Sequence, residues 1–285
     1  MSRSVLPRLI ATDLDHTLLR GDRTVSTRTA KALDAARAAG IMVVPATARN
    51  PVGLAAVNDV SRFSDWALCG NGAYGIHLTT EEILFTVELK QRVLLEVTAM
   101  LSTEFPGVRF AAVRDAGRHF LAQEGYAELA TLADHNRDPA TMGALALASV
   151  CDSPALKLIA RHPDIDAAEL LSHARSLLGD VGTTESVEMT TSGAPFIEIM
   201  APGVTKATGL ERLCAHLGII PAEVVTFGDG INDIEMLRWA GHGVAVANAA
   251  AEVREAADHV TAANDDDGVA LVIEELLTAA PDSPR

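Results

Sequence analysis

The sequence predicts an α/β fold with a doubly wound, mainly parallel sheet, into which a separate α+β module is inserted. Two observations lead to this fold class. Short apolar runs alternate with helical patterns at both ends of the chain, whereas the middle of the chain changes to closely spaced β-like runs. The 285 residues allow one large domain or two of ordinary size. We therefore expect a core formed by residues 1–85 and 196–285, and an inserted module formed by residues 86–195.

The expected strands of the core are continuous apolar runs that end in small or polar residues. Runs of this length are typical of strands buried on both faces, as in a parallel sheet. They are residues 8–13 (RLIATD), 42–47 (MVVPAT), 66–70 (WALCG), 224–229 (VVTFGD) and 243–248 (GVAVAN).

Helical patterns lie between these runs. Ser26 is suited to cap a helix over 26–40, and Thr205 is suited to cap another over 205–218. A third helix is expected from about 232 to 241. In the inserted module, strands are expected at 108–113, 119–123, 155–160 and 186–190, and a helix at 166–179.

Composition and charge exclude several classes of protein. The 23 Lys and Arg residues against 38 Asp and Glu give a net charge of −15, which argues against binding to nucleic acid or to an anionic membrane. The three cysteines have no short spacing, so neither a zinc site nor a disulfide framework is predicted. The cysteine pattern, together with the lack of a secretory signal and of an apolar run of 18 or more residues, leads us to expect a cytoplasmic protein. We expect it to act on a small molecule as a monomer or small homo-oligomer.

Residues capable of chemistry stand at the carboxyl ends of three expected strands. Ligands of open α/β sheets bind beyond the carboxyl ends of the strands, so these residues should converge on one edge. They are Asp13, Asp15, Thr47, Asp229, Asn232 and Asp233.

The four aspartates of this set would repel one another. Two carboxylates about 4 Å apart repel by roughly 4 kcal/mol at an effective dielectric constant near 20. A divalent cation would offset this repulsion directly. Ligands that are all oxygen, with no nearby His or Cys, favour Mg²⁺ over Zn²⁺, and Mg²⁺ bound in this way keeps positions for water and substrate phosphate. We therefore predict Mg²⁺ as the cofactor.

Lys206 falls in the first turn of the helix that Thr205 would cap. A cation there opposes the helix dipole and costs a few tenths of a kcal/mol. The placement is reasonable if an anion binds at that helix start, where free N–H groups attract phosphate. Lys206 and Mg²⁺ would then hold a phosphoryl group from two sides.

Together, these residues form four separated motifs: DLDHT (13–17), Thr47 with Arg49, Lys206, and GDGINDIEML (228–237). In order, spacing and position of the inserted module they resemble the haloacid-dehalogenase-like (HAD) phosphatases, and among these the Cof-type subfamily IIB with a large α+β cap. Further matches are NGA (71–73), AVANA (245–249) and NDDDGVA (264–270). The resemblance implies a Rossmann-like core and a cap that covers the site and selects the substrate.

The resemblance also implies a reaction, the Mg²⁺-dependent hydrolysis of small phosphate monoesters such as sugar phosphates or phosphorylated cofactors. Asp13 would be the nucleophile that forms an aspartyl-phosphate, and Asp15 would be the general acid and base. The metal ligands would be Asp13, Asp15 through its backbone carbonyl, Asp229, and Asp233 at or just behind the metal. The groups that hold phosphate oxygens would be Thr47, Ala48, Lys206 and Asn232.

Two positions depart from the usual pattern of the family. His16 stands where the family usually has Gly, which eases a tight backbone path, and Ala48 stands where Gly is commoner. His16 could touch the substrate or be a tolerated substitution. Neither departure removes a group that the chemistry needs.

Arg49, in the second motif, could contact the substrate or form a structural salt bridge.

Two other functions would use the same residues. A phosphomutase similar to phosphomannomutase would return the phosphoryl group to a sugar, with dependence on a sugar bisphosphate and little release of inorganic phosphate. A phosphoacceptor signalling module resembling a response-regulator receiver also has an acidic Mg²⁺ pocket, a Thr and a Lys. A receiver has no cap of this size and no need for Asp15, and a long-lived phospho-Asp13 would favour it.

Overall fold

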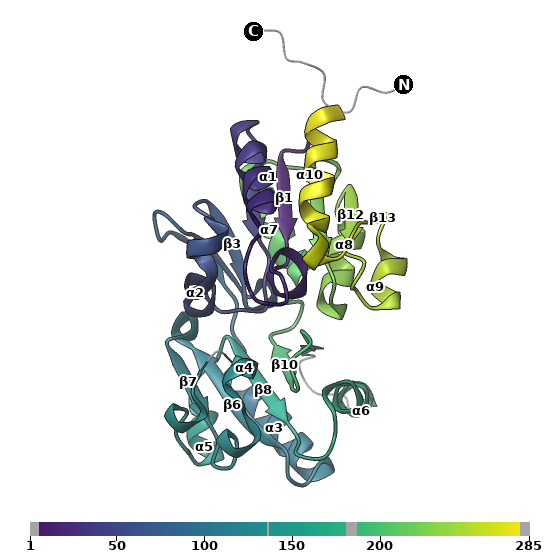
Figure 1. Ribbon diagram of the computed structural model, residues 1–285. Coiled ribbons are helices and arrows are strands. Elements are labelled where there is room, and N and C mark those ends of the chain that lie inside the picture. The colour runs from purple at the N-terminus through teal and green to yellow at the C-terminus, as the bar shows by residue number, and fades with distance from the viewer. Residues whose placement is uncertain (1–5, 136, 181–186, 280–285) are drawn as a thin grey trace. The chain divides into compact units, whose positions relative to one another are not determined.

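The computed structural model describes residues 6–135, 137–180 and 187–279, which form two compact units (Figure 1). The described residues of the first unit, here called the core, fall within Met1–Ala48, Leu54–Leu84 and Thr205–Arg285. Those of the second unit, here called the cap, fall within Arg49–Gly53 and Phe85–Val204. The expected α/β fold with an inserted α+β module is thus confirmed.

The core is built on a parallel sheet of five strands in the order β13-β12-β11-β1-β2. The central strands β1 and β11 are buried along their whole length, which explains why their sequences are continuous apolar runs. The strands are β1 (Leu9–Thr12), β2 (Met42–Pro45), β11 (Val224–Gly228), β12 (His242–Ala245) and β13 (His259–Val260).

A smaller sheet of three strands, in the order β3-β4-β5, continues from the β2 edge. Ala46, just past β2, forms a parallel bridge with Leu68 of β3. Strand β3 then pairs antiparallel with β4. The bounds are β3 (Trp66–Cys69), β4 (Tyr74–His77) and β5 (Ile83–Thr86).

Helices flank the parallel sheet in two packed pairs, α1 with α10 and α7 with α8 (Figure 1). Both predicted N-caps are present. Ser26 Oγ accepts from the Thr29 backbone N–H at 3.0 Å, and Thr205 Oγ1 accepts from the Thr208 backbone N–H at 3.2 Å. The helices that precede or follow the inserted module along the chain are α1 (Thr27–Ala38), α2 (Pro51–Ser61), α7 (Lys206–Leu217), α8 (Ile234–Trp239), α9 (Ala251–Ala256) and α10 (Gly268–Ala279).

The register of the parallel strands positions the candidate residues. Thr12 of β1 lies beside Pro45 of β2 on one side and beside Phe227 of β11 on the other. The residues that follow these three therefore leave the sheet at one carboxyl edge.

The cap contains an antiparallel sheet in the order β7-β6-β8-β10-β9. Alternate residues of this sheet, such as Phe110, Leu158 and Ile197, form one hydrophobic cluster with α3 and α6. The elements are α3 (Gln91–Glu104), β6 (Arg109–Arg114), β7 (His119–Ala122), α4 (Leu132–His135), α5 (Leu147–Val150), β8 (Lys157–Arg161), α6 (Ala167–Asp180), β9 (Glu188–Thr190) and β10 (Ile197–Met200). Residue 186 of the expected run at 186–190 lies outside the described residues.

Strand β10 corrects the expected boundary after the inserted module. The sequence places residues from 196 onward in the core, but Ile197 and Ile199 pair antiparallel with β8, and the cap extends to Val204. The reason is that a short buried run such as IEIM is compatible with either kind of sheet, and only its pairing partner decides.

The opposite face of the cap sheet is partly polar. Lys157 of β8 and Glu198 of β10 form a buried ion pair there, and Ser192 donates to the second carboxylate oxygen of Glu198 at 2.9 Å. Tyr126 and Phe196 belong to a second apolar cluster that does not include α3 or α6. Among the described residues, none of the helices combines the length and the apolar character that a membrane-spanning segment needs.

We expect the strand that carries the first candidate residue to contribute strongly to stability. Ile10 in β1 is fully buried, so Ile10→Ala should lower the free energy of unfolding by about 2–5 kcal/mol. Ile220 is 60% exposed, and Ile220→Ala is the matched control, with an expected change below about 0.5 kcal/mol. Urea unfolding of both variants measures the difference, and equal losses would contradict the packing described here.

Candidate active site

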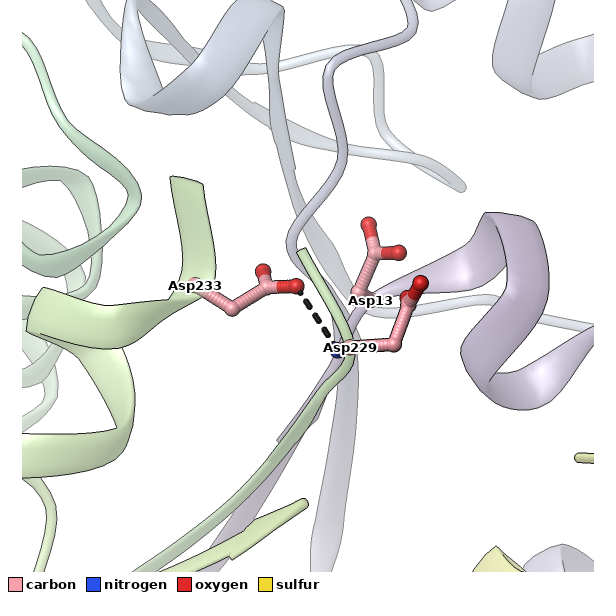
Figure 2. Close-up of side chains that lie close together, drawn as sticks. All are labelled: Asp13, Asp229 and Asp233. Carbon is pink, nitrogen blue, oxygen red and sulfur yellow. Dashed lines mark hydrogen bonds between the residues drawn. The ribbon is translucent and has the colours of Figure 1, made fainter. Parts of the chain in front are cut away.

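Three carboxylates converge at the carboxyl edge of the core sheet (Figure 2). Asp13 directly follows β1, Asp229 directly follows β11, and Asp233 immediately precedes α8. A carboxylate oxygen of each lies within 4.8 Å of those of the other two. We call these three residues the acid cluster. The parallel register brings the first two together, and the short turn after β11 returns the third to the same place.

Lys206 is the first residue of α7 and is buried in the acid cluster. Its Nζ donates to Oδ1 of Asp13 and to Oδ1 of Asp233, at 2.6 Å in both cases. Burial by itself would lower the pKa of this ammonium group, but the charges of the two carboxylates outweigh burial and raise the pKa. Lys206 therefore links the end of β1 to the turn before α8.

Asp233 organises the turn that carries Asp229. Its Oδ2 accepts from the backbone N–H of Asp229 at 3.0 Å, the contact dashed in Figure 2, and from that of Gly230 at 2.9 Å. A Cβ atom on Gly228 would lie 2.4 Å from Cβ of Asp233, so only glycine fits there. Through these contacts Asp233 holds the turn and Lys206 in place.

The acid cluster carries more negative charge than Lys206 offsets. Burial raises the pKa of Asp13 well above its usual range; Lys206 opposes this rise, and Asp233 adds to it. Burial is also the largest cause of the raised pKa of Asp229. A bound divalent cation would remove this excess charge. Because the donor atoms of the acid cluster are all carboxylate oxygens, the residues present fit Mg²⁺.

Thr17 is a residue of the site that the sequence reasoning missed. It is fully buried, and its Oγ1 donates to Oδ1 of Asp229 at 2.5 Å. This hydrogen bond fixes the orientation of the Asp229 carboxylate. The signal that could have revealed Thr17 is its place in the first motif, four residues after Asp13.

The turn after β1, which carries Asp15, is held by two asparagines. Asn248 Nδ2 donates to the backbone oxygen of His16 at 2.8 Å, and Asn248 Oδ1 accepts from the backbone N–H of Asn264 at 2.9 Å. Asn264 Nδ2 in turn donates to the backbone oxygen of Leu19 at 2.9 Å. The sequence matches AVANA and NDDDGVA thus supply side chains that fix this turn, a role that the sequence did not predict.

His16 adopts a left-handed backbone conformation, with φ 62° and ψ 4°. Glycine takes such a conformation without strain, which accounts for the glycine that the family usually has here. The His16 side chain is exposed. The backbone of this turn therefore does not exclude a side chain, although it disfavours one.

The remaining predicted site residues lie outside the acid cluster, in both units of the chain. Thr47 is buried just past β2, and Ala48 beside it is half-buried. Asn232 Nδ2 donates to Oδ1 of Asn71 at 2.9 Å. Asp15 is half-buried and is not a member of the acid cluster. Arg49 belongs to the cap, where its Nη1 donates to the backbone oxygen of Gly53 at 3.2 Å.

Comparison with known proteins agrees with this fold. The family profile of the haloacid dehalogenase-like hydrolases matches residues 10–273, and the chain therefore belongs to this family. The provisionally named phosphatase YxeH of Bacillus subtilis is 32% identical over 279 residues, which cover 95% of this chain and 99% of that protein. The 5-amino-6-(5-phospho-D-ribitylamino)uracil phosphatase YitU of the same organism is 29% identical over 276 residues, which cover 95% of this chain and 98% of that protein.

Among solved structures, that of the HAD subclass IIB sugar phosphatase BT4131 is similar, with a TM-score of 0.78 and 24% identity, covering 94% of this chain and 98% of that one. The predicted HAD fold with a IIB-type cap is therefore confirmed, and so is the prediction of an enzyme of the phosphatase type.

We expect the Thr17 hydroxyl to strengthen metal binding, because it orients the Asp229 carboxylate. Thr17→Val removes the donor but keeps the side-chain shape, and should weaken Mg²⁺ binding by about 10–100-fold. Thr17→Ser keeps the donor and is the matched control. Titration calorimetry with Mg²⁺ measures both variants, and equal affinities of the Val and Ser variants would contradict this role.

Proposed function

We propose that this HAD-type phosphatase hydrolyses small phosphate monoesters, depends on Mg²⁺, and uses an aspartyl-phosphate on Asp13 as the intermediate. The observation that carries the proposal is the buried contact of Lys206 with both Asp13 and Asp233 beside Asp229. A cation and several carboxylates at the carboxyl edge of a parallel sheet suit phosphoryl transfer, where positioning and charge neutralisation provide most of the catalysis.

The metal would be held by the carboxylates of Asp13 and Asp229 and by the backbone carbonyl of Asp15, with Asp233 just behind it. The hydrogen bonds that Asp233 and Thr17 make support this assignment, since they orient the turn and the carboxylate of Asp229. When bound, Mg²⁺ neutralises charge on the phosphoryl oxygens and orients them for in-line attack.

In the first step, a carboxylate oxygen of Asp13 attacks phosphorus, and the bond from phosphorus to the ester oxygen breaks. Asp15 gives its proton to the leaving alkoxide. Water then attacks the phosphorus of the aspartyl-phosphate, Asp15 takes a proton from that water, and the bond to Asp13 breaks. Lys206 donates to Oδ1 of Asp13 and so orients the proposed nucleophile.

Lys206 also places a positive charge where negative charge develops on the phosphoryl oxygens. Thr47, the backbone of Ala48, and Asn232 would hold the remaining phosphate oxygens. Their positions support this: Thr47 lies just past β2, and Asn232 lies in the turn between Asp229 and Asp233.

The substrate class we propose is a phosphate ester of a small polyhydroxylated compound. Two relatives support it by their names, one as a phosphatase of a phosphoribitylamino-uracil and one as a sugar phosphatase. The net charge of −15 further favours a small anion attracted by a local cationic site over a polyanion that needs a basic surface.

The direct test is release of inorganic phosphate from a panel of sugar phosphates, nucleotides and phosphorylated cofactors, with Mg²⁺ and with EDTA. We expect release with Mg²⁺ and loss of release with EDTA, because the acid cluster then lacks its neutralising cation. Asp13→Asn, checked for folding by circular dichroism, should release no phosphate. Phosphate release by that variant would refute the nucleophile. Little release of inorganic phosphate by the wild type, together with turnover of a sugar phosphate that depends on a sugar bisphosphate, would indicate a mutase.

Asp15 should matter most when the leaving group is a poor one. With an alkyl phosphate, Asp15→Asn should lower kcat by about 10²–10⁴-fold, since the alkoxide needs a proton as it leaves. With p-nitrophenyl phosphate, whose leaving group is already stable as an anion, formation of the phosphoenzyme should be much less affected. Rapid-quench measurement of phosphoenzyme formation compares the two, and the same loss for both substrates would contradict general-acid catalysis.

A further inference from the structure

The loop Gly70–Gly72, which follows β3, contacts two of the segments that would hold phosphate. Asn71 at its centre is buried and left-handed, with φ 57° and ψ 33°. Its backbone N–H donates to the backbone oxygen of Thr47 at 3.0 Å, and its side-chain Oδ1 accepts from Asn232 Nδ2 at 2.9 Å. One residue thus joins the end of β2 to the turn after β11.

The same loop packs tightly against the first turn of α7. A Cβ atom on Gly72 would lie 2.2 Å from the backbone oxygen of Thr205, and one on Gly209 would lie 2.7 Å from Cα of Gly72. The two backbones are therefore closer than any side chain allows. Because Lys206 is the first residue of α7, this contact also fixes where its side chain starts.

The contacts of Asn232 leave its side chain few alternatives. One N–H of its amide is given to Asn71, and a Cβ atom on Gly230 would lie 2.5 Å from Asn232 Oδ1, so the amide lies close over that glycine. A primary amide has two N–H donors, and fixing one of them fixes the direction of the other. The second N–H is then preorganised for an acceptor.

We propose that Asn71 is a positioning residue, which aims the Asn232 amide at a phosphate oxygen and sets its spacing from Thr47 and Lys206. The inference rests on the proposed function, because it assigns phosphate to Asn232. Asparagine suits the position on two grounds: it tolerates the left-handed conformation better than most residues, and its side chain supplies the acceptor. Preorganised donors of this kind contribute to catalysis because they need no rearrangement when charge develops.

A double-mutant cycle tests whether Asn71 acts through Asn232. Asn71→Gly keeps the left-handed backbone and the N–H to Thr47 but removes the side-chain acceptor. The Kd of inorganic phosphate in the presence of Mg²⁺ is measured by titration calorimetry for wild type, N71G, N232A and the double variant. The matched control is Glu81→Gly. Glu81 belongs to the core unit, is exposed to solvent, and has the same left-handed backbone, with φ 58°.

We expect N71G to raise the Kd of phosphate roughly three- to tenfold, the loss of one oriented hydrogen bond. In the N232A background the same change should alter the Kd by less than about twofold, because the group that Asn71 positions is gone. E81G should leave the Kd unchanged, and thermal unfolding of all variants checks that the fold persists.

The results separate this inference from the proposed function. If wild type binds no phosphate with Mg²⁺, the proposed function fails and the inference fails with it. If wild type binds phosphate but N71G binds it equally well, only the inference is overturned. Independent, additive losses in N71G and N232A would also overturn it, because they would show a general structural effect.

Discussion

The buried ammonium group of Lys206 is the interaction on which the rest of the site depends. It joins Asp13 to Asp233, and the first of these contacts spans 193 residues of sequence. An unpaired charge in such a place would be very unfavourable, and removing one partner of a buried ion pair commonly costs about 3–5 kcal/mol. The electrostatic requirement of this one cation therefore constrains β1, α7 and the turn before α8 together.

Several side chains near the acid cluster only orient other groups and do not act on the substrate themselves. Thr17 binds a carboxylate oxygen of Asp229, and Asn248 and Asn264 bind backbone oxygens of the turn after β1. None of them belongs to the set proposed to act on the substrate. Their number reflects a general need, since a catalytic group is effective only where other side chains and the backbone keep it in one orientation.

The cap has a hydrophobic core of its own. Its antiparallel sheet buries one face against two helices, while the other face carries the ion pair of Lys157 and Glu198. Only residues 201–205 separate its last described strand, β10, from Lys206. Apolar residues of similar volume often stabilise a sheet face as well as a buried ion pair does. The Lys157–Glu198 pair therefore gives this face of the cap sheet a polar character beyond what packing needs.

Much of the fold and site was determined by local features that the sequence displays. Continuous apolar runs predicted four strands of the parallel sheet, β1, β2, β11 and β12. Ser26 and Thr205 predicted two helix starts, and Asp13 and Asp229 at strand ends predicted the edge where they meet. These predictions succeed because each depends on a few adjacent residues and on the rule that parallel strands share one carboxyl edge.

The tertiary structure alone decided which distant groups meet. Three contacts join residues that lie far apart in the sequence, and no local pattern predicts them. They are Thr17 with Asp229, Asn71 with Asn232, and Asn248 with the turn after β1. The membership of β10 in the cap was likewise decided by its partner β8, since a buried apolar run is compatible with either sheet. Local preference determined what each segment could become, and long-range pairing determined its place, because hydrogen bonds between distant segments depend on the whole fold.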